Sequence, residues 1–132
     1  RKVRVEFSGK EAVLPHKIPE LIVNLCDDLR ERLNHLDPKD VNYIESLVEL
    51  LSWFQHRFVW IHPFVDYNGR IARMLTSFIT VYLHLPPIEI KAGTAKDRKV
   101  YLEAMYAADA GNYGKLEYLI AQALNESLTK ST

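Results

Sequence analysis

At residues 62 to 73 the sequence reads His62-Pro63-Phe64-Val65-Asp66-Tyr67-Asn68-Gly69-Arg70-Ile71-Ala72-Arg73. A proline disfavours the α-helical conformation at the residue before it. We therefore expect a helix that arrives from the N-terminal side to end near Ile61. His62 would then lie at the corner between helix and loop with its imidazole exposed. The rest of the chain is interpreted as a scaffold for this stretch.

A second helix is predicted to begin within the same stretch, with Asn68 or Asp66 as its N-terminal cap. Apolar residues recur there at helical spacing, as Ile71, Met74, Leu75, Phe78, Ile79 and Tyr82. A helix N-terminus offers free N–H groups and the positive end of its dipole to an anion, and Gly69 lets the backbone approach that anion closely. Arg70 and Arg73 lie three residues apart, on one face of the first turn, where their guanidiniums can bind phosphate in bidentate fashion.

The acid and the base of this stretch suit phosphoryl-transfer chemistry. Asp66 suits Mg²⁺, which binds through one or two carboxylates together with phosphate oxygens of a substrate. The imidazole of His62, with an ordinary pKa of about 6.5, accepts a proton near neutral pH. Mg²⁺ and arginines offset the negative charge of the transferred group. Each residue alone has an ordinary structural explanation, but together at this spacing they indicate a site.

These residues resemble the signature of the Fic domain family, H-P-F-x-[D/E]-G-N-G-R-x-x-R, at every fixed position except one. Fic enzymes mostly transfer AMP from ATP to a Ser, Thr or Tyr hydroxyl of a target protein. The resemblance implies that His62 is the general base and that Asp66 binds Mg²⁺. It implies a phosphate cradle of Asn68, Gly69 and Arg70, with Arg73 on the γ-phosphate. It also implies an all-α helical bundle with a short N-terminal β-hairpin, called the flap.

Tyr67 stands where the family signature has a glycine. This departure bears on whether the backbone reaches the α-phosphate and on whether the ring screens the pocket. Two alternatives to AMP transfer therefore stay open. One is transfer of another phosphate-containing group, such as UMP, phosphocholine or a γ-phosphate, although the phosphate-transferring relatives resemble this chain less, because they lack the acid at Asp66. The other is a nucleotide-binding or interaction module without catalysis.

Length and composition indicate a single domain, residues 1–132, and exclude several functional classes. Apolar residues make up 48% of the chain, and 17 basic and 17 acidic side chains give a formal net charge of zero. We therefore expect no binding to nucleic acid or to an anionic membrane surface, and no apolar run approaches the roughly 20 residues that span a bilayer. The single cysteine, Cys26, lies in a segment with apolar helical spacing and is expected in the core. It has no partner for an internal disulfide, so we expect a reducing compartment, the cytoplasm.

Residues 1–14 are expected to form the flap. Residues 2–7 alternate charged and apolar side chains, which predicts a half-exposed strand, and residues 12–14 are predicted to return as a second strand after a turn at Ser8-Gly9. In the family, this hairpin aligns the target segment by strand addition, in which main-chain hydrogen bonds hold an extended peptide. The sequence begins inside the first strand pattern, so we expect a fragment that lacks an N-terminal segment.

Four more helices are predicted around the motif helix. The first spans about Ile18 to Asn34. The second starts at Asp37-Pro38, as cap and first helical residue, and continues to Trp60, so that it delivers His62. Beyond the motif helix, one helix is capped by Asp97 and ended by Gly111, and the last covers about residues 113–128.

The helix after Asp97 is expected to contribute the nucleobase site. In the family, an aromatic, an apolar and a polar side chain of this helix line the base, and the resemblance assigns these roles to Tyr101, Met105 and Asp109. Core packing is the alternative for Tyr101 and Met105. His56 is interpreted as a surface or supporting residue, because no second metal-ligand motif accompanies it.

The expected partners are ATP, a target protein and an inhibitory helix. Many Fic proteins are inhibited by a helix with the pattern Ser/Thr-x-x-x-Glu-Gly/Asn, whose glutamate pairs with the second motif arginine, here Arg73. That pattern does not occur in this sequence. An inhibitory helix would therefore come from a missing N-terminal segment in cis or from another chain in trans.

Overall fold

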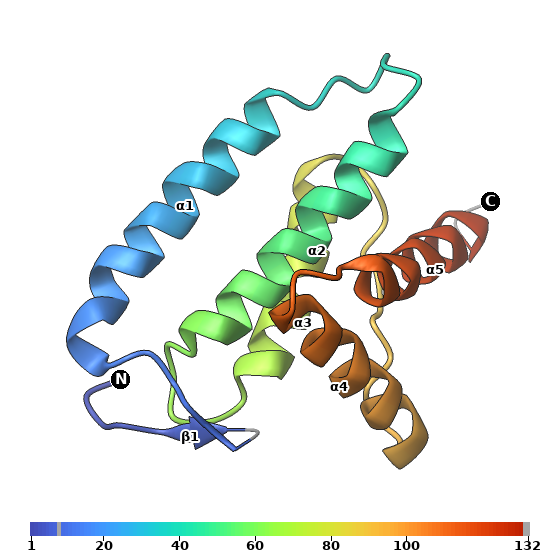
Figure 1. Cartoon of the computed structure of the whole chain (residues 1–132). Coiled ribbons are helices and arrows are strands. Elements are labelled where there is room, and N and C mark those ends of the chain that lie inside the picture. Colours follow the sequence, from blue (N-terminus) through green and yellow to red (C-terminus); the bar gives the residue numbers. More distant parts are fainter. Residues whose placement is uncertain (8, 131–132) are drawn as a thin grey trace.

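The computed structural model describes residues 1–7 and 9–130, which form a helical bundle with a short hairpin at the N-terminus (Figure 1). The α-helices of this part of the chain are α1 (Ile18–Asn34), α2 (Tyr43–Ile61), α3 (Asn68–Tyr82), α4 (Ala95–Asp109) and α5 (Gly114–Lys130). A 3-10 turn, Pro15–Lys17, leads into α1. The predicted all-α bundle with an N-terminal hairpin is confirmed.

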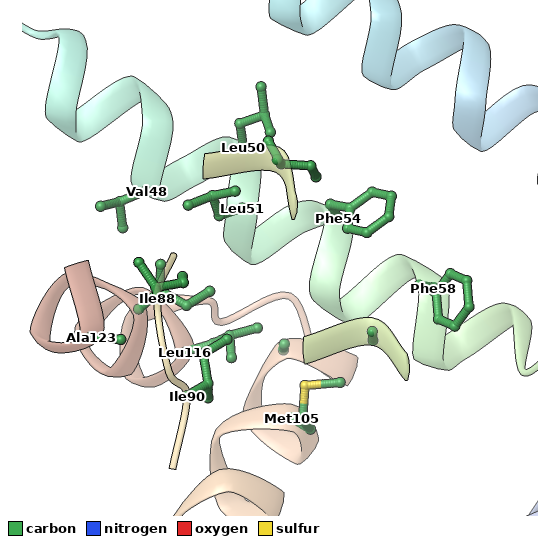
Figure 2. Close-up of a cluster of buried hydrophobic side chains, with 14 of the residues drawn as sticks. Val48, Leu50, Leu51, Phe54, Phe58, Ile88, Ile90, Met105, Leu116 and Ala123 are labelled. Atoms are coloured by element: carbon green, nitrogen blue, oxygen red, sulfur yellow. The ribbon is translucent and has the colours of Figure 1, made fainter. Parts of the chain in front are cut away.

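Helix α2 is the centre of the bundle and contacts each of the other α-helices in the described residues. In Figure 1 it runs through the middle of the molecule, with α1 alongside it. Leu47, Leu51 and Ile61 of α2 are fully buried. Figure 2 shows Leu50, Leu51, Phe54 and Phe58 spaced along α2, in a cluster that also contains Leu116 and Ala123 of α5 and Ile88 and Ile90 of the segment between α3 and α4. A helix that is apolar on several faces is stable only when neighbours surround it. This packing holds α2 in place, and with it His62 at the end of the helix.

Two predicted helix starts are wrong, and side-chain hydrogen bonds explain both. Helix α2 begins at Tyr43 and not at Pro38, because the Asp37 carboxylate accepts from the Lys39 N–H (2.9 Å) and Asp40 repeats this turn on Asn42 (2.8 Å). Asp side chains that bond the backbone two residues on favour turns over helix. Helix α4 is capped by Thr94, whose hydroxyl accepts from the N–H of Asp97 (3.1 Å), so Asp97 lies in the first turn and is not the cap.

The hairpin has shorter strands than the sequence predicts. Strands β1 (Glu6–Phe7) and β2 (Lys10–Glu11) pair antiparallel, with Glu6 opposite Glu11 and Phe7 opposite Lys10. The predicted turn residue Ser8 lies outside the described residues. Beyond the ladder, Ala12 N–H still donates to the Val5 carbonyl (2.8 Å). The predicted return strand at residues 12–14 does not form, because the Val13 carbonyl accepts instead from the guanidinium of Arg1 (2.6 Å).

The prediction that Cys26 lies in the core is wrong, because its side chain is exposed as a free thiol. Helix α1 turns only a narrow stripe inward, with Ile18 and Leu25 buried, and the next residue along a helix points about 100° away. Across the described residues, no helix combines the length and the apolar character that crossing a membrane requires.

Replacing Ser52 of α2 by alanine is expected to stabilise the fold. Ser52 is fully buried, and its hydroxyl has no hydrogen-bond partner among the described residues. An unsatisfied buried hydroxyl costs about 1–3 kcal/mol, so Ser52→Ala should raise the free energy of unfolding in urea by about 1 kcal/mol. Ser46→Ala, on the exposed side of the same helix, is the control for helix propensity. A lower stability for Ser52→Ala than for Ser46→Ala would contradict the expectation.

Candidate active site

The corner between α2 and α3 is bounded by two left-handed residues. The N–H of His62 still donates to the Phe58 carbonyl (3.1 Å), as in a helix, but φ at His62 is 54°. At the other end of the loop, φ at Tyr67 is 65°. The left-handed conformation costs an ordinary L-residue about 1–2 kcal/mol. The predicted end of the helix at Ile61 is confirmed, and backbone strain lies at both ends of the loop.

The loop is closed by the side chain of Asn68, which is almost fully buried. Its Oδ1 accepts from the N–H of Phe64 (3.0 Å), and its Nδ2 donates to the Phe64 carbonyl (2.9 Å). Asp66 Oδ1 accepts from the N–H of Tyr67 (2.7 Å). The prediction that Asn68 or Asp66 caps α3 is therefore wrong: Tyr67 occupies the cap position, with no side-chain cap hydrogen bond. Within the described part of the chain, no side chain caps the N–H groups of the first turn of α3.

The imidazole of His62 is buried, contrary to the sequence prediction, with an exposed fraction of 8%. The ring of Phe7 in β1 stacks on it, with 4.2 Å between the ring centroids and an interplanar angle of 7°. Burial lowers the pKa of His62 below its ordinary value of 6.5, against the opposing effects of the Val59 carbonyl and the Asp66 carboxylate. Near neutral pH the ring is therefore uncharged.

The tautomer of His62 follows from its contact with Val59. Nδ1 lies 3.3 Å from the Val59 carbonyl, and a carbonyl only accepts hydrogen bonds, so the proton of the neutral ring is on Nδ1. Nε2 is left with the lone pair. Proton acceptance by this histidine would therefore take place at Nε2.

One cavity of about 620 Å³ collects most of the predicted site residues. Its lining includes the predicted base, the predicted metal ligand and the predicted cradle, namely His62, Asp66, Asn68, Gly69, Arg70, Arg73 and Tyr101. Arg98 of α4 and Glu89 also line it and were missed by sequence reasoning. No local sequence pattern indicates either residue, because both reach the cavity through tertiary packing.

Tyr67 extends its ring to Arg70. The guanidinium carbon of Arg70 lies 5.1 Å from the centroid of the Tyr67 ring, whose side chain is largely exposed at the cavity. Such a cation–π contact contributes about 0.5–1 kcal/mol at an exposed site. The residue that replaces glycine is thus engaged with an arginine of the predicted phosphate cradle.

The three residues assigned to the nucleobase lie in different surroundings. Tyr101 lines the 620 Å³ cavity, and Met105 is buried in the core and lines neither this cavity nor the next. Asp109 lines a separate cavity of about 1060 Å³ beneath the flap, together with Phe7 and Lys10. Because Phe7 and His62 stack while lining different cavities, their rings form part of the wall between the two.

His56 is buried beside Asp109, so its interpretation as a surface residue is wrong and a supporting role remains. Its Nε2 donates to Asp109 Oδ1 (2.7 Å), and its Nδ1 is hydrogen-bonded to the hydroxyl of Tyr113 (3.2 Å). Lys10 in the flap donates to the other oxygen of Asp109 (3.4 Å). These contacts connect the flap to the C-terminal end of α4.

Comparisons with known proteins show the family of this chain. A family profile described as the Fic/DOC family matches residues 1–80. The chain belongs to the Fic/DOC family. A Fido domain-containing protein of Dictyostelium discoideum is 33% identical over 104 residues, which cover 78% of this chain and 66% of that protein.

Two relatives of this Fic/DOC-family chain are named protein adenylyltransferases. The protein from Nematostella vectensis is 27% identical over 106 residues, covering 77% of this chain and 24% of the relative. The protein from Caenorhabditis elegans is 25% identical over 112 residues, covering 85% of this chain and 21% of the relative. The chain thus spans about a quarter of the length of these two relatives.

Removing the Phe7 ring is expected to raise the pKa of His62 toward 6.5, because water then reaches the imidazole. The pKa can be measured by NMR titration of the imidazole C–H signals, with the His62 signal assigned by its loss in His62→Ala. Since burial lowers this pKa in the folded state, wild-type stability should fall as the pH drops below about 6.5, and Phe7→Ala should weaken this dependence. Glu6→Ala, the exposed neighbour, should leave the pKa of His62 unchanged, and an unchanged pKa in Phe7→Ala would refute the role of the ring.

Glycine at position 67 is expected to be more stable than alanine, because φ there is positive. Both variants lose the contact with Arg70, so they differ mainly in backbone strain. In urea, the free energy of unfolding of Tyr67→Gly should therefore be about 1 kcal/mol higher than that of Tyr67→Ala. At Val65, where φ is not positive, the same pair should have the opposite order, because glycine is there the more flexible residue in the unfolded chain. The same order at both positions would contradict this account.

Proposed function

We propose that this chain transfers AMP from ATP to a hydroxyl side chain of a target protein. The single observation that carries the proposal is the convergence of His62, Asp66, Arg70 and Arg73 on one cavity at the N-terminus of α3. Two arginines beside uncapped N–H groups suit an anion with several charges, such as a triphosphate. The names of the Nematostella and Caenorhabditis relatives support adenylyl transfer as the reaction.

His62 is the proposed general base. Nε2 takes the proton of the target hydroxyl while the hydroxyl oxygen bonds to the α-phosphorus. The bond between the α-phosphorus and its bridging oxygen breaks, and pyrophosphate leaves. The lowered pKa keeps Nε2 unprotonated near neutral pH, and the Val59 carbonyl holds the ring by Nδ1. A base must have its lone pair free at the working pH, and both observations support this.

Asp66 is the proposed Mg²⁺ ligand, and its surroundings fit that role. Its side chain is exposed, and its Oδ1 accepts a backbone hydrogen bond from the N–H of Tyr67. Among residues 1–7 and 9–130, no three His, Cys, Asp or Glu side chains gather as a metal cage, so Asp66 would share the ion with phosphate oxygens, as Mg²⁺ sites commonly do. When bound, Mg²⁺ would supply positive charge to the phosphates.

The flap is the proposed docking site for the target. Its strands β1 and β2 pair only with each other in the described residues, so each has an outer edge that an extended peptide can pair with through main-chain hydrogen bonds. Phe7 of β1 stacks on His62, which puts the flap directly beside the proposed base. We also propose the cytoplasm as the compartment, and an inhibitory helix, in cis or in trans, as a partner of Arg73.

A catalytically impaired nucleotide-binding module is the second candidate, and Tyr67 is the observation in its favour. Tyr67 lines the cavity with a largely exposed side chain, and its ring contacts Arg70. A phosphate that needs this arginine would have to compete with the ring. Transfer of another phosphate-containing group is the third candidate function for the same site.

Intact-mass measurement of the chain incubated with Mg²⁺ and ATP tests the proposal, because an adenylyltransferase often modifies itself. Wild type should gain the mass of one AMP, and His62→Ala should gain none while still binding ATP in calorimetry, since a base acts in the transition state. A gain of one phosphate would indicate phosphate transfer. ATP binding without any gain would favour the impaired module, and Tyr67→Gly should then restore transfer.

A further inference from the structure

Gln55 is a fully buried amide in the middle of α2, the helix that ends at His62. Its Nε2 donates a short hydrogen bond to the hydroxyl of Tyr101 in α4. Its Oε1 accepts from the hydroxyl of Thr76 in α3 (2.9 Å). A buried amide is costly unless both of its ends are bonded. This amide therefore ties α2, α3 and α4 together at one point.

The Tyr101 ring connects this point to the predicted phosphate site. Tyr101 is almost fully buried, and burial raises the pKa of its phenol, so the hydroxyl keeps its proton. The guanidinium carbon of Arg73 lies 4.9 Å from the centroid of the Tyr101 ring. Thr76 follows Arg73 by three residues and so lies on the same face of α3. The polar cluster of Gln55, Thr76 and Tyr101 is thus connected to Arg73 through the Tyr101 ring.

Gly69 leaves room for the guanidinium of Arg73 beside the first turn of α3. A Cβ atom at Gly69 would lie 3.1 Å from Nη1 of Arg73 and 3.8 Å from the Tyr101 ring. The guanidinium therefore lies close both to the backbone of the first turn of α3 and to the ring of Tyr101. Among the described carboxylates, none forms an ion pair with Arg73. Its charge is held in place but is not neutralised.

We propose that Gln55 and Tyr101 are positioning residues, which hold the Arg73 guanidinium for the terminal phosphate of a nucleoside triphosphate. The inference rests on the proposed function, in which this cavity binds a nucleotide. Gln55 sets the position of the Tyr101 ring, and the ring sets that of Arg73. Arginine has many rotamers, so a preformed guanidinium binds an anion at a lower entropic cost.

Two readouts separate positioning from a merely structural role. The first is the order of the Arg73 side chain, measured by ¹⁵N relaxation at Nε in the nucleotide-free protein. The second is the ratio of ATP to AMP affinity in calorimetry with Mg²⁺, because AMP has no terminal phosphate for Arg73. A purely structural pair would lower the melting temperature and leave both readouts unchanged.

The variants are Tyr101→Phe, which keeps the ring, and Gln55→Leu, which keeps the buried volume close to that of the amide. Both should make Arg73 mobile and weaken ATP binding about tenfold while AMP binding changes less than about twofold. The ATP affinity of the double variant should be no lower than that of the weaker single variant, because both residues act through one contact. Thr80→Val is the control, since Thr80 is a fully buried α3 threonine whose hydroxyl donates to the Ser77 carbonyl (2.7 Å).

The inference would be overturned if the Arg73 side chain were as ordered in both variants as it is in Thr80→Val. Equal losses of ATP and AMP affinity would also overturn it. A wild-type protein that binds neither nucleotide would refute the proposed function. The relaxation measurement would still decide the positioning of Arg73 in that case.

Discussion

Two hydrogen bonds from one buried amide, that of Asn68, hold the site together. The amide bonds both the N–H and the carbonyl of Phe64, so it closes the loop that carries the chain from α2 into α3. Because the side chain is used on the loop, it does not cap α3. The same contact therefore fixes the position of the loop and leaves the first turn of the helix open to an anion.

Strain and desolvation are concentrated at this loop, and the core offsets both. His62 and Tyr67 hold left-handed backbone at its two ends, and the His62 ring is buried under Phe7. Local strain of this kind persists only where the surrounding structure determines it. Here the determining element is α2, which contacts every other α-helix of the described residues and contributes Leu51, Phe54 and Phe58 to the buried cluster of Figure 2.

One helix serves two cavities because successive helical residues point in different directions. On α2, Gln55 bonds Tyr101, which lines the motif cavity, and its neighbour His56 bonds Asp109 beneath the flap. The end of α2 then delivers His62, whose ring forms part of the wall between the cavities. Any shift of α2 would move the proposed base and both sets of supporting contacts together.

The sequence by itself determined the elements whose causes are local. Pro63 ends α2 at Ile61, apolar spacing predicts α3 from Asn68, and the residues of the 62–73 motif indicate the family. The sequence pattern placed the start of α2 too early. At residues 37–42, two Asp side chains bond the backbone and compete with a helix, and a small difference in free energy settles this competition.

Only the tertiary structure decided the environment of those residues. The burial of His62 depends on Phe7, which is 55 positions away in the sequence, and the support of Arg73 depends on Gln55 and Tyr101 from two other helices. Periodicity reports which face of a helix is apolar but not which partner covers it. A pKa, a tautomer and the position of a guanidinium are set by such partners, so they follow from packing and not from local sequence.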